Sequence, residues 1–589
     1  MLKPSVFGDI SPKVSRALDE EVKDQALISD EPKSSDYELK EQPLSRDDRH
    51  SRGLPLKLYR HYADIQRSYE QADDFDGLYA VQREQMRTDA RANISEEKLD
   101  SQRKLRQAKV YSVFFLITTD ILGPSNAPYA IAQMGYVPGI ILYVVFGIMA
   151  ALGGYLLNYC FCKLDSNNYP IRTFSDLAGR AVGAWFRYPT ALLQFVQMIM
   201  NVGLILLSTA QSLAQLLVTN RGHNGLCYTV EIVVWSFLGM ILGQIKTLSR
   251  FAHIANSAVW MNVAVCIITM VAVGIENKPN YDLFWSNYGC TAPYDTLSIH
   301  KYAIAPGSLS DRIDGMNNMV FAWGGATVFC EVMYELKKPM DFWKGMLCAQ
   351  AFIMVIYLVF GLFVYSYLGQ WSYVTANMGI ATRALQTATN VINLVSGMLA
   401  AVLYANVGLK VAYQGFLVSD FGFPQITTKK GTIFWGVLVI IYWAVAFIIG
   451  AAIPGISQLV SIIGAFCIFQ FSYTLPFLFI LCLLIRLDAT EPDTFDPTTE
   501  TLVKADSFAS WSRWKRALTH GGYLRTSIKL CAFLLFLAAL SCAGLCSYSA
   551  IEAAIAFYKN SSASAFGCTA PVSPNSGFTC AGITVGASP

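Results

Sequence analysis

The sequence predicts an all-α integral membrane protein with eleven transmembrane helices, of which the first and the sixth are broken. Only 15% of its 589 residues are charged and 53% are hydrophobic, whereas about a quarter of the residues in a soluble domain are charged. Apolar runs of about twenty residues, the length that crosses a bilayer, recur along the chain. Two of these runs, five spans apart, contain helix-breaking residues, and this relation predicts an inverted five-plus-five repeat.

Residues 1–109 are polar and of mixed charge, and we expect them to form a cytoplasmic tail that is largely disordered. The stretch from Leu54 to Gln107 has a more helical pattern, which indicates a helix at the surface or at the membrane interface. The first hundred residues contain no apolar run of the kind that signal peptides have, so we expect the first span itself to direct insertion.

Eleven apolar stretches of spanning length follow. They define a membrane domain over residues 110–549, and residues 550–589 form an extracytoplasmic C-terminal tail. The predicted spans are residues 110–133, 136–162, 188–218, 228–246, 252–274, 314–334, 346–368, 390–413, 432–452, 455–485 and 527–549.

Lysine and arginine gather in the loops on one side of the predicted spans, for example at Lys337, Lys338 and residues 513–516. The short loops of the opposite side hold Arg221 and Arg383. Because short loops rich in positive charge stay in the cytoplasm, we expect the N-terminus to be cytoplasmic. Eleven spans then place the C-terminus outside, and we expect the plasma membrane rather than the vacuolar membrane.

Most of the fourteen cysteines lie in apolar runs, where a free thiol behaves as a small hydrophobic group. Four others, Cys227, Cys290, Cys568 and Cys580, fall on the predicted outer side, which permits disulfides. Their positions favour a pair between Cys568 and Cys580, which are close in sequence, and a pair between Cys227 and Cys290, which would tie two loops together. The alternative is that all four are free thiols.

The first span contains the run DILGPSNAP, in which the segment Gly123–Pro128 cannot continue an ordinary helix. One half-helix would end just before this segment, and a second would begin near Ala127 with Asn126 as its N-cap. The N–H groups of the second half-helix can hold a carboxylate, and the carbonyls that end the first can hold an ammonium group or a cation. The break therefore favours a zwitterionic ligand. The alternative is a simple proline kink in a packed helix.

Asp120 lies just before this break. An ionisable residue inside a span is a functional candidate by default, and the position of Asp120 would suit a carrier of a coupling proton. The alternative is a structural role, in which the carboxyl group forms a hydrogen bond with Thr118 or Thr119.

The sixth span reads MNNMVFAWGGATVFCEVMYELKKP, and Gly324-Gly325 at its middle is the second candidate break. Phe321 and Trp323 are expected to form the wall of a side-chain pocket. Glu331, farther along the same span, is a candidate for a gating or coupling role.

The eighth span contains one lysine, Lys410, toward its cytoplasmic end. One interpretation is that its long side chain reaches the membrane interface. The other is that its ammonium group takes the place of a sodium ion near the first break.

The sequence contains no nucleotide-binding loop, nucleophile elbow, zinc-protease motif or Cys/His metal spacing. We therefore expect no cofactor, no metal and no enzymatic activity. The net charge of +3 is too small to indicate a nucleic-acid partner. The expected partners are a small-molecule ligand and the lipid bilayer.

Several segments resemble a known family of transporters. They are the run DILGPSNAPYAIAQMGYVPG at residues 120–139, the segment Thr173–Gly179, the pair Phe321–Gly325 and Glu335–Pro339, and the Ala452–Pro454 turn. Together, and in this order, they resemble the amino acid/auxin permease family within the amino acid–polyamine–organocation superfamily. The long N-terminal tail resembles the fungal members.

The resemblance extends over roughly residues 105 to 550 and implies a leucine-transporter-type fold. It also implies secondary active transport of an amino acid, coupled to a proton rather than to sodium, by alternating access. The sequence shows no strong countercharge for a charged side chain, so we expect a neutral amino acid. A transporter-like sensor that signals through the cytoplasmic tail is the alternative function. The binding residues that the resemblance implies are Gly123, Pro124, Ser125, Asn126, Ala127, Phe321, Trp323, Gly324 and Gly325.

Overall fold

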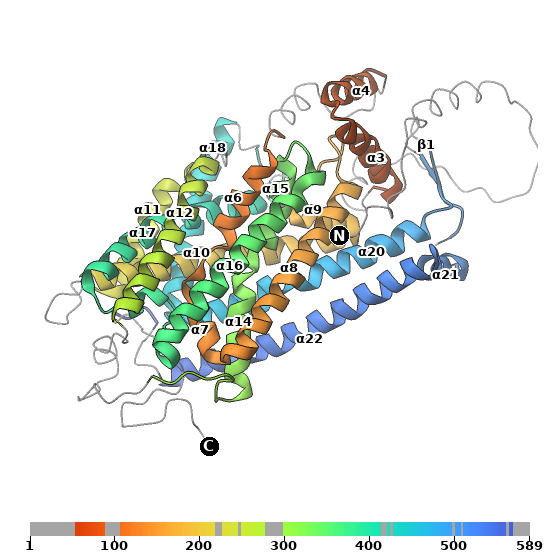
Figure 1. Cartoon of the computed structure of the whole chain (residues 1–589). Coiled ribbons are helices and arrows are strands. Elements are labelled where there is room, and N and C mark those ends of the chain that lie inside the picture. The colour runs from red at the N-terminus through yellow and green to blue at the C-terminus, as the bar shows by residue number, and fades with distance from the viewer. Residues whose placement is uncertain are drawn as a thin grey trace, which may run out of the picture. The chain divides into compact units, whose positions relative to one another are not determined.

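The computed structural model describes a mostly helical chain (Figure 1). The predicted disordered tail up to residue 53 lies outside the described residues. The described residues are 54–88, 106–217, 226–245, 249–276, 299–413, 417, 421–424, 428–496, 501–507, 510–560 and 565–568.

Eight helical stretches in this described part are long and apolar enough to cross a membrane. Three other predicted spans coincide with shorter or interrupted apolar helices, so the count of eleven stays a prediction. The eight stretches are formed by α8 (Tyr136–Leu164), η2–α10 (Ala184–Leu217), α12 (Ser249–Glu276), η5–α16–η6 (Pro339–Trp371), α17 (Arg383–Ala412), α18 (Lys429–Ala452), the run from α19 to α20 (Ile456–Ala489) and α22 (Gly522–Asn560).

The backbone of the first apolar segment departs from the α-helix inside the predicted break. Helix α6 (Val110–Ile121) is followed by the short 3-10 helix η1 (Pro124–Asn126) and then by α7 (Ala127–Met134). Gly135 ends α7 with φ of +90°, where an added Cβ would lie 2.7 Å from the backbone nitrogen of Ala305. A side chain is therefore excluded at this turn both by backbone conformation and by space.

The second interruption separates α14 (Leu309–Ala322) from α15 (Phe329–Glu335). The 3-10 helix η4 (Gly324–Val328) lies between them. Helix α14 begins with a capping box, in which Ser308 and Asp311 satisfy each other's backbone N–H groups. This cap fixes the start of the helix that leads to the second interruption.

The interrupted helices pack against continuous ones. Helix α16 (Phe342–Leu368) contacts α6, α7 and α8, and α8 and α16 run side by side in Figure 1. Helices α10 (Arg187–Leu217) and α17 pack along each other, with α18 against α10. Continuous helices thus pack around the interruptions.

The last helices also belong to this packing, since α22 contacts α14 and α20 contacts α8. Helix α20 (Leu475–Ala489) runs beside α22, as Figure 1 shows. Two short π-helical segments, η9 (Gly464–Ile468) and η10 (Gln470–Thr474), join α19 (Ile456–Ile463) to α20. The remaining elements are α9 (Phe174–Ala181), α11 (Tyr228–Leu242), η7 (Ala376–Gly379), the antiparallel pair β1 (Thr494–Asp496) and β2 (Thr501–Val503), and α21 (Trp511–Thr519).

The helical pattern before the first span corresponds to α3 (Leu56–Ala72) and α4 (Phe75–Thr88). Helix α3 packs against α8, and Arg67 donates to the carboxylate of Asp165 at 3.0 Å. Arg106 donates to the same carboxylate through both terminal nitrogens, at 2.9 Å each. Burial alone would raise the pKa of Asp165, but the two arginines outweigh it and the pKa is lowered.

The structure pairs Cys227 with Cys568, so both predicted disulfides are wrong. Each predicted pair contributes one cysteine to this bond, Cys227 from one pair and Cys568 from the other. Their predicted partners, Cys290 and Cys580, lie outside the described residues. Tyr228 donates its N–H to the carbonyl of Cys568 at 3.1 Å, which holds the segment after α22 against the start of α11. Closeness in sequence misled the prediction because the two bonded cysteines are 341 residues apart.

Candidate functional site

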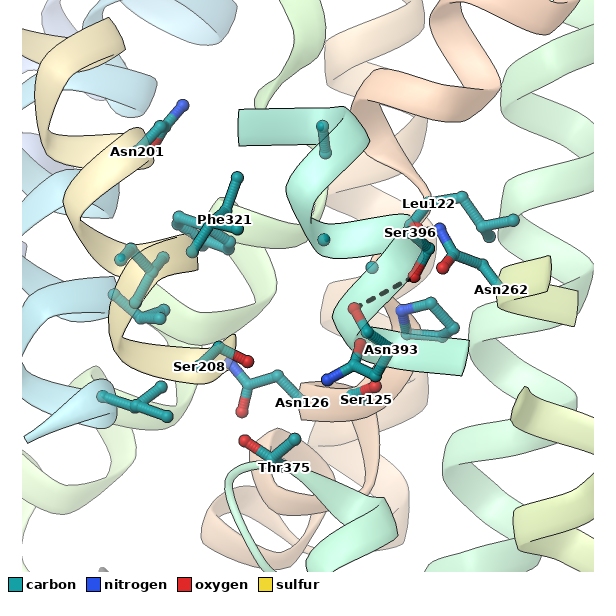
Figure 2. A pocket seen from close by; sticks show the side chains of 18 of the residues that line it. Leu122, Ser125, Asn126, Asn201, Ser208, Asn262, Phe321, Thr375, Asn393 and Ser396 are labelled. Carbon is teal, nitrogen blue, oxygen red and sulfur yellow. Dashed lines mark hydrogen bonds between the residues drawn. The ribbon is translucent and has the colours of Figure 1, made fainter. Parts of the chain in front are cut away.

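A cavity of about 220 Å³ lies between the two interruptions (Figure 2). This volume is below the roughly 300–1,000 Å³ of sites for drug-sized ligands, so the cavity suits a smaller solute. Both interruptions contribute to it, together with α10, α12, α16, α17 and α19. The lining residues used below are Leu122, Gly123, Pro124, Ser125, Asn126, Asn201, Ser208, Asn262, Phe321, Gly324, Tyr357, Thr375, Asn393, Ser396, Ile456, Val460 and Ile468.

Two neighbouring helices hold the first interruption in place. Gly123 donates its backbone N–H to the hydroxyl of Tyr357 on α16 at 3.1 Å. The side-chain nitrogen of Asn262 on α12 donates to the carbonyl of Leu122 at 2.9 Å. Peptide groups that leave the helical ladder need such partners, and these two side chains supply them at the edge of the cavity.

Two asparagines present oxygen acceptors at the cavity. The side-chain nitrogen of Asn126 donates to the side-chain oxygen of Asn318 at 2.6 Å, whereas the oxygen of Asn126 has no hydrogen-bond partner. The side-chain oxygen of Asn201 on α10 also has none. Buried acceptors are normally satisfied, so these two oxygens are suited to accept from a bound donor such as an ammonium group.

The rest of the wall is polar on one side and apolar on another. Figure 2 shows Ser208, Asn393 and Ser396 on one pair of helices, and Phe321 at the second interruption. The hydroxyl of Ser396 donates to the carbonyl of Asn393 at 3.4 Å, which is the dashed line in the figure. Among the described residues that line the cavity, none is Asp, Glu, Lys, Arg or His. The described part of the cavity wall therefore offers no ionised side chain to a ligand.

The structure brings six of the nine predicted binding residues to the cavity wall and leaves three outside it. Trp323 is 1% exposed, and its ring centre lies 6.1 Å from that of Tyr357 rather than at the cavity. Ala127 and Gly325 are buried and do not line the cavity. The six at the wall are Gly123, Pro124, Ser125, Asn126, Phe321 and Gly324.

The coupling candidates lie in other places. The side chain of Asp120 is outside the described part of the structure. Glu331 accepts from the side-chain nitrogen of Gln194 at 2.8 Å and does not line the cavity. Lys410 and Glu335 lie close enough for their charges to interact, also away from the cavity. Neither Glu331 nor Lys410 therefore contacts a ligand held there.

Several wall residues were missed by sequence reasoning, although each is a polar residue inside an apolar run. Asn201, Asn262 and Asn393 stand out in this way once every span is searched for amides. Tyr357 lies in the middle of a predicted span and Thr375 lies between two predicted spans, and neither position carried such a signal. Only their packing brings them to the interruption.

The profile of the family described as "Transmembrane amino acid transporter protein" matches residues 106–498, more than half of the chain. The chain belongs to this family. The match begins just before α6 and ends after β1, so it contains the cavity and both interruptions. This finding confirms the family predicted from the motifs.

Two fungal relatives are similar to this chain over 62% of its length. The "N amino acid transport system protein" of Neurospora crassa is 25% identical over 379 residues, which cover 62% of this chain and 74% of the relative. A "Transmembrane transporter" of Gibberella moniliformis is 24% identical over 62% of this chain and 73% of its own length. These relatives and the family are transporters and not enzymes, so this member of the family is a multi-pass membrane transporter.

Among solved structures, one similar chain is that of Mhp1, a nucleobase-cation-symport-1 family transporter, in a closed conformation with bromovinylhydantoin bound. The two chains are 12% identical and superpose with a TM-score of 0.44, over 77% of this chain and 94% of Mhp1.

Proposed function

We propose that this transporter carries neutral amino acids by alternating access, in symport with protons. The observation that supports the proposal is the cavity itself, which lies between two helix interruptions and has no ionised side chain among its described lining residues. A zwitterion with an uncharged side chain matches such a site, because helix ends bind its two charges without a counter-ion from a side chain.

The ligand's carboxylate would face the start of α7. The first turn of a helix leaves N–H groups without intrahelical partners. Pro124 and Pro128 carry no N–H and Ala127 donates to the carbonyl of Pro124, so Ser125 and Asn126 would supply the donors. The ammonium group would face the carbonyl of Leu122 and the unpartnered oxygens of Asn126 and Asn201. Phe321 would contact the substrate side chain, so its size is expected to limit which amino acids enter.

The arrangement in the membrane belongs to the same proposal. We infer a leucine-transporter-type fold of eleven spans, in which α6–α7 form the broken first span and α14–α15 the broken sixth span. The N-terminus would be cytoplasmic and the C-terminus outside, in the plasma membrane. Asp120, Glu331 and Lys410 are the sequence candidates for proton coupling, and the hydrogen bond that Glu331 accepts from Gln194 supports Glu331.

Uptake by the purified chain in proteoliposomes tests the proposal. Labelled neutral amino acids are supplied with and without an inward proton gradient, and accumulation above the outside concentration is expected only with the gradient. A sensor of the same fold would bind the amino acid but accumulate none. Absence of both binding and uptake, for every neutral amino acid tried, would refute the proposal.

A further inference from the structure

Asp314 is a buried carboxylate on α14 that sequence reasoning did not single out. The residue is 8% exposed, in the same helix that ends at the second interruption. Its carboxylate accepts a hydrogen bond from the hydroxyl of Ser461 on α19. A carboxyl group inside a membrane protein is expensive to keep ionised without a cation beside it.

No such cation is found among the described residues. None of the described lysines, arginines or histidines forms an ion pair with Asp314. The titratable groups that face it are Tyr129 on α7, Cys546 on α22 and Asp311 on α14 itself. None of these supplies a positive charge, so no group in the described part of the chain neutralises Asp314.

A chain of hydrogen bonds connects Asp314 to the cavity. Asn318, one turn farther along α14, donates its side-chain N–H to the backbone carbonyl of Asp314 at 2.9 Å. The side-chain oxygen of Asn318 accepts from Asn126 at 2.6 Å, and Asn126 lines the cavity. Asn318 thus joins the α14 backbone at Asp314, rather than its carboxyl group, to the first interruption.

Helix α19 provides a second connection. Ser461 binds Asp314 and Ser457 donates to the hydroxyl of Tyr129 on α7 at 3.4 Å. The same helix places Ile456 and Val460 on the cavity wall. The hydroxyls on α19 thus hold α7 and α14 together on one side of the cavity.

We propose that the carboxyl group of Asp314 binds the coupling proton, and that Asn318 and α19 connect this proton to the substrate cavity. The inference rests on the proposed function and names the residue through which the proton gradient acts. When Asp314 is ionised, the Ser461 hydroxyl must donate to it. When a proton is bound, the carboxylic acid has its own O–H donor, and Ser461 is released to form other hydrogen bonds. The contact between α14 and α19 therefore differs between the two protonation states.

Asp314→Asn tests this assignment, because the amide has the shape of the protonated acid and cannot ionise. The variant is expected to exchange labelled for unlabelled amino acid within about threefold of the wild-type rate. Accumulation driven by a proton gradient should fall at least about tenfold. Glu231→Gln is the matched control, because Glu231 on α11 is also a buried carboxylate but no described hydrogen bond connects it to the cavity. This control should accumulate substrate as the wild type does.

Ser461→Ala provides a readout if Asp314→Asn does not fold. The Ser461 hydroxyl stabilises the ionised carboxylate, so its removal favours the protonated acid and should move the midpoint of the pH profile of uptake to higher pH. An unchanged midpoint would overturn the proposal, as would gradient-driven accumulation in Asp314→Asn, or loss of exchange in an Asp314→Asn protein that is folded.

Two results with the wild-type protein separate this inference from the proposed transport of amino acids. Uptake of neutral amino acids that a sodium gradient drives and a proton gradient does not would leave amino-acid transport standing and overturn the proton site. Absence of any amino-acid uptake would instead refute the proposed function.

Discussion

Gly324 has no room for a side chain at the second interruption, and this contact can be tested by a pair of substitutions. A Cβ added at Gly324 would lie 2.6 Å from Cδ1 of Ile468 on η9, and 3.1 and 3.2 Å from its next two carbons. Overpacking of this kind typically costs about 1–3 kcal/mol. Gly324→Ala should therefore lower the apparent melting temperature of the protein in detergent.

Ile468→Val removes Cδ1, the atom that the new methyl group would strike. By itself this change costs about 0.5–1.5 kcal/mol, because it leaves a small void. In the double variant the void receives the new methyl group, so we expect the double variant to melt at a higher temperature than Gly324→Ala alone. Residues in contact commonly show such coupling, of about 0.5–3 kcal/mol.

Gly123→Ala is the matched control, since an added Cβ there meets nothing within 4 Å. It should leave the melting temperature close to that of the wild type, even if it lowers uptake by intruding on the cavity. The melting temperatures are measured on purified, monodisperse protein. Strict additivity of the two substitutions would refute the close contact between the second interruption and η9.

The other predictions concern contacts around the cavity and at both ends of the chain. Tyr357→Phe removes the acceptor for the Gly123 N–H and should raise the KM for uptake about 2- to 10-fold. This factor corresponds to the loss of a hydrogen bond of about 0.5–1.5 kcal/mol. An unchanged KM would contradict this. Asp165→Asn leaves the buried Arg106 without a carboxylate and Arg67 with Glu70 alone, and it should destabilise the protein by about 3–5 kcal/mol. Because the folded pKa of Asp165 is lowered, its stabilisation is complete above the unfolded pKa of about 4. It is lost as the pH falls through the folded pKa, so melting curves of wild type and variant should converge in acid and diverge at neutral pH. Peptide mapping without reductant should recover the Cys227–Cys568 cross-link, and recovery of two free thiols would count against it.

Local chemistry explains what could be predicted from the sequence. Proline lacks an N–H and cannot continue an α-helix, so Pro124 and Pro128 mark the segment where α6 has ended and the 3-10 helix η1 leads into α7. The glycine pair at Gly324 marks the other segment in the same way. Each signal lies within a few residues of the feature that it predicts, and the family motifs lie at the same positions.

What could not be predicted depends on contacts between distant segments. Trp323 was expected at the cavity because it adjoins the second interruption, but its ring packs against Tyr357 and Gly147, where an added Cβ would lie 2.7 Å from the indole. The sequence alone does not indicate toward which neighbours the Trp323 side chain points. The Cys227–Cys568 bond could not be predicted for the same reason, since only the fold brings α11 beside the chain after α22. Asp314 is the first residue of a predicted span, and only the fold shows that it is buried and bonded to Ser461 on α19.

The absence of ionised side chains among the described cavity residues has a consequence for selectivity. A substrate with a charged side chain would have to place that charge in a buried site without a partner, at a cost of about 3–5 kcal/mol. At about 1.4 kcal/mol per factor of ten, this cost corresponds to discrimination of roughly a hundredfold or more. Glutamine and glutamate form a matched pair for the test, because they are nearly identical in shape and differ in charge.

Competition with labelled uptake of a neutral amino acid measures this difference. Glutamine is expected to inhibit uptake at a concentration at least about a hundredfold below that needed for glutamate, measured at pH 7, where the glutamate side chain is ionised. The hydroxyl and amide groups of Ser208, Asn393 and Ser396 can bond to an uncharged polar side chain, but they do not neutralise a carboxylate. If glutamate competed as well as glutamine, a cation outside the described residues would have to face the cavity, and helix ends and amides could not be the whole basis of recognition.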